Sequence, residues 1–291
     1  MRRLLLPALL ALTLTACSVP SVAQIQNAPL PPTAMLESAE EPIQYTVELQ
    51  TWEQSSQAED GTPLVSCTYT LPVLAASRGD GTAVDEAQTE QEERALAVTE
   101  AFNREFQAWT TGETFDELTQ EAQADLDWRR TEDVPWTTGY VLDLECQVYQ
   151  TEELISVSGT HYNFLDGAAH PNIWRMSWNF DLTDGAFFAP DFLAEGSELQ
   201  TAVTEEIIRQ ANEPLEDGTV PAEFYWEDYR DIAANWSTAA VSFDAVGMTV
   251  IFSPYELAAY GFGEQTFRVS YDFLRPYLSD HGLELLGLAE E

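Results

Sequence analysis

A chain of 291 residues is long enough for one to three domains and a sizeable hydrophobic core. Its 12 basic residues are all arginines and face 50 acidic residues, so the formal net charge is −38. The absence of lysine excludes P-loop, Schiff-base and general-base lysines, and so negative a charge disfavours nucleic acid, whose phosphates require a basic surface. Because 45% of the residues are hydrophobic, the sequence predicts a folded acidic protein with a cationic or uncharged partner.

The N-terminus has the composition of a secretion signal. Two arginines precede an apolar run over residues 4–14, which is too short to span a bilayer but typical of a signal peptide. The run ends in Leu14-Thr15-Ala16-Cys17, which resembles the bacterial lipobox; the alternative is an ordinary signal peptide with a chance cysteine. We expect a signal peptide over residues 1–16, lipidation of Cys17, and anchoring to the outer face of the bacterial cytoplasmic membrane. Removal of the signal peptide, which contains two arginines and no acidic residue, takes the net charge to −40.

Two cysteines remain besides Cys17. Cys67 and Cys146 both lie in strand-like runs, and an even number in an oxidising compartment favours one disulfide between neighbouring strands. Two separate buried thiols are the alternative. Without a third cysteine or a CxxC pair, a thiolate metal site is disfavoured.

The first half of the chain predicts a tether, a hairpin and helices. Residues 17–42 are rich in Pro, Ala, Ser and Glu without apolar periodicity, which is typical of an extended tether. Strand patterns follow at 45–52 and 64–74, joined through the turn signal Asp60-Gly61. Apolar residues then recur at helical spacing over 95–109, and a shorter helix is predicted over 115–126.

The second half is richer in strands. A helix is predicted to begin at Ser197, with Gln200 completing a capping box. The strand patterns lie at 139–150, 154–164, 174–182, 239–243, 248–252 and 265–270. Strands and helices do not alternate regularly, so we expect an α+β fold with mostly antiparallel sheet and a few packed helices.

Three segments resemble one known family. Residues 162–172, which read Y-N-F-L-D-G-A-A-H-P-N, are similar to the tyrosine–glycine–glycine–alanine–histidine loop of the extracellular domain of the RsiV-like, lysozyme-sensing anti-sigma factors. Residues 180–185 (F-D-L-T-D-G) and 252–263 (F-S-P-Y-E-L-A-A-Y-G-F-G) resemble that family's F-D-L-x-T-G and Y-E-I-A-P-Y-A-x-G segments. The resemblance covers roughly residues 43–280 and implies two tightly associated subdomains, 43–172 and 173–291.

The chain departs from this family in two ways. Ala168 stands where the family loop has its second glycine, and alanine costs free energy there if the position needs a positive φ. We find no counterpart in this sequence of the family's transmembrane helix and sigma-binding region. The same domain pair precedes a catalytic domain in a peptidoglycan deacetylase, and we find no counterpart of that domain either. The resemblance therefore implies the binding half of such proteins as a freestanding lipoprotein.

The sequence offers little catalytic chemistry. His161 and His170 flank Asp166, which allows a His/Asp metal cluster, but we favour a His170 that holds its loop through hydrogen bonds to backbone. The G-x-S-x-G, H-E-x-x-H and G-x-G-x-x-G motifs are absent from the sequence. Fifty acidic residues make chance carboxylate pairs inevitable. We expect no catalytic residues, no metal and no cofactor.

Binding residues are suggested mainly by the resemblance. The aromatic set Tyr225, Trp226, Tyr229 and Trp236 predicts core packing in preference to a carbohydrate platform. The resemblance implies a ligand-binding surface formed by Gly167, Ala168, Ala169, His170, Tyr255, Glu256 and Tyr260.

Three functions follow from these observations. The first is a lipid-anchored binding protein for an envelope or host-derived ligand, for which a basic lysozyme-like muramidase is the family precedent. The second is a module that binds peptidoglycan fragments or another glycan, and the third is an enzyme acting on cell-wall sugars.

Overall fold

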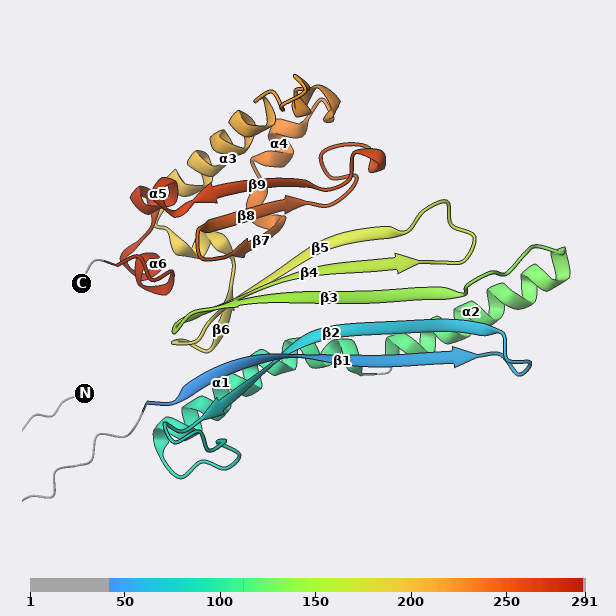
Figure 1. Ribbon diagram of the computed structural model, residues 1–291, viewed down its shortest axis with the longest axis horizontal. Coiled ribbons are helices and arrows are strands. Elements are labelled where there is room, and N and C mark those ends of the chain that lie inside the picture. The colour runs from blue at the N-terminus through green and yellow to red at the C-terminus, as the bar shows by residue number, and fades with distance from the viewer. Residues whose placement is uncertain (1–41, 112, 290–291) are drawn as a thin grey trace, which may run out of the picture. The chain divides into compact units, whose positions relative to one another are not determined.

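Two β-sheets with helices packed on them make up the computed structural model, which describes residues 42–111 and 113–289 (Figure 1). The predicted signal peptide, Cys17 and the tether up to residue 41 lie outside the described residues. The strands are β1 (Gln44–Gln57), β2 (Pro63–Ser77), β3 (Tyr140–Gln150), β4 (Leu154–Phe164), β5 (Asn172–Asp181), β6 (Ala186–Phe188), β7 (Ala240–Phe243), β8 (Gly247–Phe252) and β9 (Gln265–Ser270). The α-helices are α1 (Glu90–Gln107), α2 (Glu113–Glu132), α3 (Glu198–Ala211), α4 (Tyr229–Ala233), α5 (Tyr271–Leu274) and α6 (Asp280–Leu285).

The larger sheet has six strands in the order β1-β2-β3-β4-β5-β6, and the smaller has three in the order β7-β8-β9. All pairs are antiparallel except β2–β3, which is parallel. The α+β prediction with mostly antiparallel sheet is confirmed, whereas the parallel pair was not predicted. The larger sheet continues past residue 172 through β5 and β6. No helix in the described part of the chain is long and apolar enough to cross a membrane.

The N-terminal hairpin forms around the predicted turn. Gly61 takes a φ of +86°, a conformation that glycine adopts at little cost. The Asp60 side chain accepts hydrogen bonds from the amide and hydroxyl of Thr62, at 3.1 and 2.7 Å. This short polar turn pairs β1 with β2 along nearly their full length.

Helix α1 supplies the centre of the first hydrophobic core. The hydroxyl of Thr89 accepts a hydrogen bond from the Glu92 amide and caps the helix. Residues at helical spacing, among them Phe102 and Phe106, face the larger sheet. The ring of Phe102 is fully buried and lies 5.2 Å from that of Phe180 on β5. The predicted helix over 95–109 is therefore confirmed.

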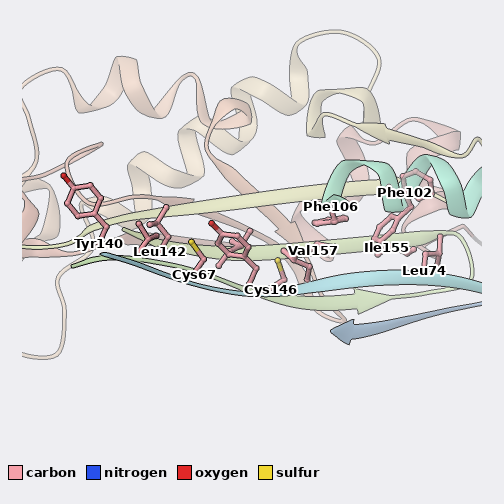
Figure 2. Packing of buried hydrophobic residues seen from close by; sticks show 14 of the residues in the cluster. Cys67, Leu74, Phe102, Phe106, Tyr140, Leu142, Cys146, Ile155 and Val157 are labelled. Atoms are coloured by element: carbon pink, nitrogen blue, oxygen red, sulfur yellow. The ribbon is translucent and has the colours of Figure 1, made fainter. Parts of the chain in front are cut away.

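The two buried cysteines lie in this core as free thiols. Cys67 on β2 is opposite Leu142 on β3, so Cys146 is four residues further along that strand, a distance of about 13 Å at 3.3 Å per residue. A disulfide requires Cα atoms within about 7 Å. Figure 2 shows the two sulfur atoms at separate places in the core. The predicted Cys67–Cys146 disulfide is wrong, because strand register separates the thiols.

The smaller sheet is joined to the larger one by side chains. On β5, Ser177 accepts a hydrogen bond from the Val241 amide and Asn179 donates one to the Val241 carbonyl, at 2.8 and 2.9 Å. On β4, Ser156 accepts one from the Phe243 amide at 2.8 Å. Three backbone groups of the edge strand β7 are therefore satisfied by side chains of the larger sheet. Figure 1 shows β7 beside β5, with α3 beyond β9.

The predicted helix at Ser197 is confirmed as α3, but the capping box is wrong. Ser197 makes no side-chain capping bond, and the side-chain amide of Gln200 donates to the carbonyl of Ala234 at 2.5 Å. Core packing is confirmed for Tyr229 and Trp236, which are both buried. Trp226, by contrast, is 40% exposed.

Candidate functional site

The two segments that the resemblance singled out meet in the structure, although His170 and Tyr255 are 85 positions apart in the sequence. The His170 Nε2 atom lies 3.1 Å from the Tyr255 hydroxyl. The imidazole ring stacks on Tyr260 with 3.8 Å between ring centroids and 18° between planes. Tyr255 and Tyr260 are themselves 5.4 Å apart. These three rings form one cluster from two separate parts of the sequence.

The loop that carries His170 is anchored by Asp166. Its buried carboxylate accepts hydrogen bonds from the amides of Thr137 and Thr138, at 3.1 and 3.0 Å, and from the Thr137 hydroxyl. The guanidinium of Arg129 lies 3.4 Å from the second carboxylate oxygen and donates to the Asp166 carbonyl. Burial alone would raise the pKa of Asp166, but these hydrogen bonds and Arg129 hold it below its usual value.

The backbone of this loop needs glycine at one position. Gly167 has a φ of +81°, and a Cβ atom there would lie 2.7 Å from an Arg129 nitrogen. Ala168 does not have a positive φ, so the departure from the family's second glycine brings no strain. His170 Nδ1 lies 2.9 Å from the Pro171 carbonyl, which confirms the predicted bond to nearby backbone. Gly167, Ala168 and Ala169 are exposed at the loop tip.

The opposing segment, residues 253–263, contains one residue in a strained backbone conformation. Tyr255 has a φ of +76°, which is uncommon for a bulky residue, and its side chain is 53% exposed. The Trp226 indole donates a hydrogen bond to the Tyr255 carbonyl at 3.1 Å. Glu256 accepts a hydrogen bond from the Ser253 amide and so closes the turn. These contacts fix Tyr255 with its ring directed at His170.

Further aromatic side chains extend the cluster across the surface. Phe224 and Phe262 contact each other with ring centroids 4.9 Å apart, and both are exposed, as is Trp226. We refer to the aromatic patch, which consists of His170, Phe224, Trp226, Tyr255, Tyr260 and Phe262. Phe262 lies inside the segment that the resemblance marked, whereas no sequence signal distinguished Phe224 or Trp226 from core residues.

Acidic residues border the aromatic patch. Five exposed carboxylates are its sequence neighbours: Glu223, Glu227, Asp228, Glu256 and Glu264. Arg175 is a cation near these residues, 3.6 Å from Glu264. The site therefore combines apolar rings with negative charge around them.

A hollow lined by aromatic side chains lies on the larger sheet, separate from the aromatic patch. Its volume is about 850 Å³, within the size range of small-molecule sites. His161 stacks on Trp174 at 5.6 Å and approaches Trp109 at 5.5 Å. Burial lowers the pKa of His161, which favours a neutral ring. We refer to this hollow as the aromatic groove; its other lining residues include Tyr69, Arg104 and Glu105.

The metal cluster considered from the sequence does not form. Within residues 42–111 and 113–289, His161, His170 and Asp166 do not share a metal-ligand group. Asp166 is occupied by Thr137, Thr138 and Arg129, while the two histidines stack on aromatic rings.

The fold resembles that of a solved DUF3298 structure. A DUF3298 family member from Bacteroides fragilis aligns with a TM-score of 0.58 and 13% identity, over 84% of this chain and 96% of that one. A DUF3298 family protein from Pseudomonas aeruginosa PAO1 aligns with a TM-score of 0.49 and 15% identity, over 84% and 97%. No family model and no curated protein matches the sequence. At 13% identity the likeness to the Bacteroides fragilis structure concerns the fold alone.

Proposed function

We propose that this protein is a non-enzymatic, RsiV-like binding protein that captures a basic muramidase of the lysozyme kind through the aromatic patch. The observation that carries the proposal is the contact of His170 with Tyr255 and Tyr260, because it unites the two segments that the resemblance marked independently. Exposed tyrosine and tryptophan side chains are the residues that most often dominate binding energy at protein interfaces.

The charge of the molecule supports a basic partner. Acidic residues border the patch, and the whole chain carries a formal charge of −38. An interface with an apolar centre and a charged rim gains affinity from the centre, whereas the rim steers association. We expect Tyr255 and Tyr260 to control dissociation, and the carboxylates to control the association rate.

A peptidoglycan fragment is the second candidate ligand, and the aromatic groove favours it. Sugar rings present apolar faces that stack on exposed indoles, and Trp174 is 45% exposed beside His161. Arg104 and Glu105 on its border could hydrogen-bond hydroxyl or amide groups. This ligand would use different residues from the muramidase, which makes the two candidates separable.

Calorimetry with lysozyme at 0.15 M salt tests the leading proposal. Truncation of Tyr255 or Tyr260 to alanine should weaken binding by about 2 kcal/mol, or about 30-fold in Kd, through faster dissociation. Trp128→Ala is the matched control, since Trp128 is 54% exposed but belongs to α2 and not to the patch. It should leave Kd unchanged.

Two outcomes would reject the leading proposal, and a third would favour the glycan candidate. No saturable heat would exclude lysozyme as the partner. Binding that falls smoothly with salt and ignores both tyrosines would be nonspecific charge attraction, which is screened beyond about 8 Å at 0.15 M. Binding of muropeptides that is lost in Trp174→Ala would favour the glycan candidate.

We also propose that Cys17 carries the lipid anchor that places the protein on the outer face of the bacterial cytoplasmic membrane. The lipobox-like sequence before Cys17 supports it. Cells fed a palmitate analogue should label the wild-type protein and not Cys17→Ala; retention of label in the variant would contradict lipidation at this residue. Stable anchoring requires two acyl chains, because one gives only marginal membrane affinity.

A further inference from the structure

A cluster of metal-ligating side chains lies where β5 ends against α6. Asp181 is the last residue of β5, Asp184 lies in the turn that follows, and His281 belongs to α6. One ligand atom from each of the three lies within 4.8 Å of the others. None of these residues belongs to the aromatic patch or the aromatic groove.

The two carboxylate oxygens of Asp181 differ in their surroundings. Oδ1 accepts hydrogen bonds from the Thr183 amide and hydroxyl, at 2.7 and 2.6 Å, and from the Asp184 amide at 3.2 Å. Oδ2 is buried and has no hydrogen-bond partner in the described part of the chain. The residue as a whole is 2% exposed. A buried carboxylate oxygen without a partner is costly, and this one points toward the cluster.

His281 faces the same oxygen. Its Nε2 atom is also buried without a hydrogen-bond partner among the described residues, and it lies 3.2 Å from Asp181 Oδ2. This histidine is the ion-pair partner of Asp181 in the described residues, and it is charged only when protonated. Arg94 reaches the turn but donates to the Thr183 carbonyl. A cation between the two unpartnered atoms would satisfy both.

Backbone packing holds His281 in this position. The Ser279 amide donates to the Leu193 carbonyl at 2.9 Å, so the start of α6 is fixed against the preceding segment. At Gly282 a Cβ atom would lie 2.3 Å from that carbonyl, which means that only glycine permits so close an approach. The ring of Phe192 packs edge-on against His281 at 5.4 Å. The ligand geometry is thus set by the fold.

We propose that Asp181, Asp184 and His281 bind one Zn²⁺ ion. Two ligands bound to zinc at about 2.0–2.1 Å in a tetrahedron lie about 3.3 Å apart, which agrees with the 3.2 Å between Oδ2 and Nε2. An imidazole nitrogen with two carboxylates suits zinc, whereas calcium prefers six to eight oxygen ligands. Asp184 is exposed and would supply its ligand oxygen from the solvent side.

The site opens onto a hollow of about 670 Å³ that Asp184 and His281 line. A fourth ligand, such as water, can therefore reach the ion from this side. Glu195 and Glu198 line the same hollow and make its electrostatic potential negative, which raises the local concentration of cations.

Titration of the chelator-treated, dialysed protein with zinc chloride tests the proposal. Calorimetry should show one saturable site per chain, and zinc at about 100 times Kd should raise the thermal midpoint by about 5–10 °C. His281→Gln and Asp184→Asn should each weaken binding at least about tenfold. Asp280→Asn is the matched control, because Asp280 lines the same hollow but lies outside the cluster; it should bind within about twofold of wild type.

Cobalt provides a second readout. Bound Co²⁺ should give a visible absorption band that is lost in Asp184→Asn. Because Asp184 is exposed, the variant should fold normally, and circular dichroism can verify this. The proposal is overturned if zinc shows no saturable binding, if Asp184→Asn and Asp280→Asn weaken it equally, or if calcium competes at equal concentration. Weak binding to many sites, unchanged in all variants, would show only that an acidic protein attracts cations.

Discussion

Replacement of Asp166 by asparagine should detach the loop of the candidate site from its support. Asparagine keeps an oxygen that can accept from the amides of Thr137 and Thr138. Its NH₂ group, however, would face the N–H groups of the Arg129 guanidinium, and two hydrogen-bond donors cannot pair. The side chains of Asp166 and Arg129 are 1% and 12% exposed, so water cannot compensate either group. Removing one member of a buried pair costs about 3–5 kcal/mol.

Because asparagine retains the bonds to backbone, we expect the lower end, about 3 kcal/mol of unfolding free energy. For a domain of this size the loss corresponds to about 6–12 °C in thermal midpoint. Urea unfolding at pH 7, followed by tryptophan fluorescence, measures it. The variant should also bind lysozyme more weakly, since His170 loses its fixed position.

The pH dependence distinguishes this pair from general acid sensitivity. The pKa of Asp166 is lower in the folded protein than in the unfolded chain. Its contribution is therefore complete above the unfolded pKa of about 3.9 and is lost as the pH falls through the lower folded pKa. The difference between wild type and Asp166→Asn should be constant near neutrality and shrink below about pH 4.

Asp60→Asn is the matched control for this experiment. Asp60 also accepts hydrogen bonds from a threonine amide and hydroxyl and pairs with an arginine, Arg130 at 2.6 Å, but both side chains are exposed. Its effect on stability should be far smaller. If Asp166→Asn unfolds within error of the wild type, or no more readily than Asp60→Asn, the anchoring role of Asp166 is refuted.

Four further predictions concern strain, packing and the thiols. Gly167→Ala should lower the free energy of unfolding by about 1–3 kcal/mol in urea titrations, because alanine meets both a positive φ and a guanidinium nitrogen; an unchanged midpoint would contradict this. Tyr255→Gly should be about 1 kcal/mol more stable than Tyr255→Ala in the same assay, since both lose the ring and only glycine relieves the φ of +76°. Phe102→Ala should cost about 3–5 kcal/mol by thermal or urea unfolding, and a cost below 1 kcal/mol would refute its central place in the core. Burial raises the pKa of Cys146 to about 12 and also raises that of Cys67, so iodoacetamide should alkylate both thiols only after unfolding. If mass spectrometry finds neither thiol labelled in denaturant, the two cysteines form a disulfide after all.

Local patterns were sufficient to predict most elements of this fold. Alternating apolar residues marked the strands, and helical spacing from Ala95 onward marked α1. The parallel pairing of β2 with β3 could not be predicted, because it depends on how the intervening helices return the chain to the sheet. The cysteines show the same limit. An even count suggested a bond, but register decides whether two thiols on adjacent strands can meet, and register is set by contacts distant in sequence.

The candidate site was predicted in part. The resemblance marked the residues around His170 and Tyr255, but no periodicity connects positions 85 residues apart, so their contact emerges only in the structure. The role of Arg129 could not be predicted from the sequence. Near the end of α2 it has the sequence context of an ordinary surface charge, yet it supports the loop by contacting Asp125, Asp166 and the Pro135 carbonyl.

The parallel β2–β3 pair also has a consequence for the order of folding. The β1–β2 hairpin and the β3–β6 meander can each form from neighbouring segments, whereas pairing β2 with β3 brings together strands separated by residues 78–139. Closing so long a segment costs chain entropy before any contact is gained, and such nonlocal pairings slow folding. We therefore expect the six-stranded sheet to assemble from two locally formed halves, and the β2–β3 seam, which carries Cys67, to close last.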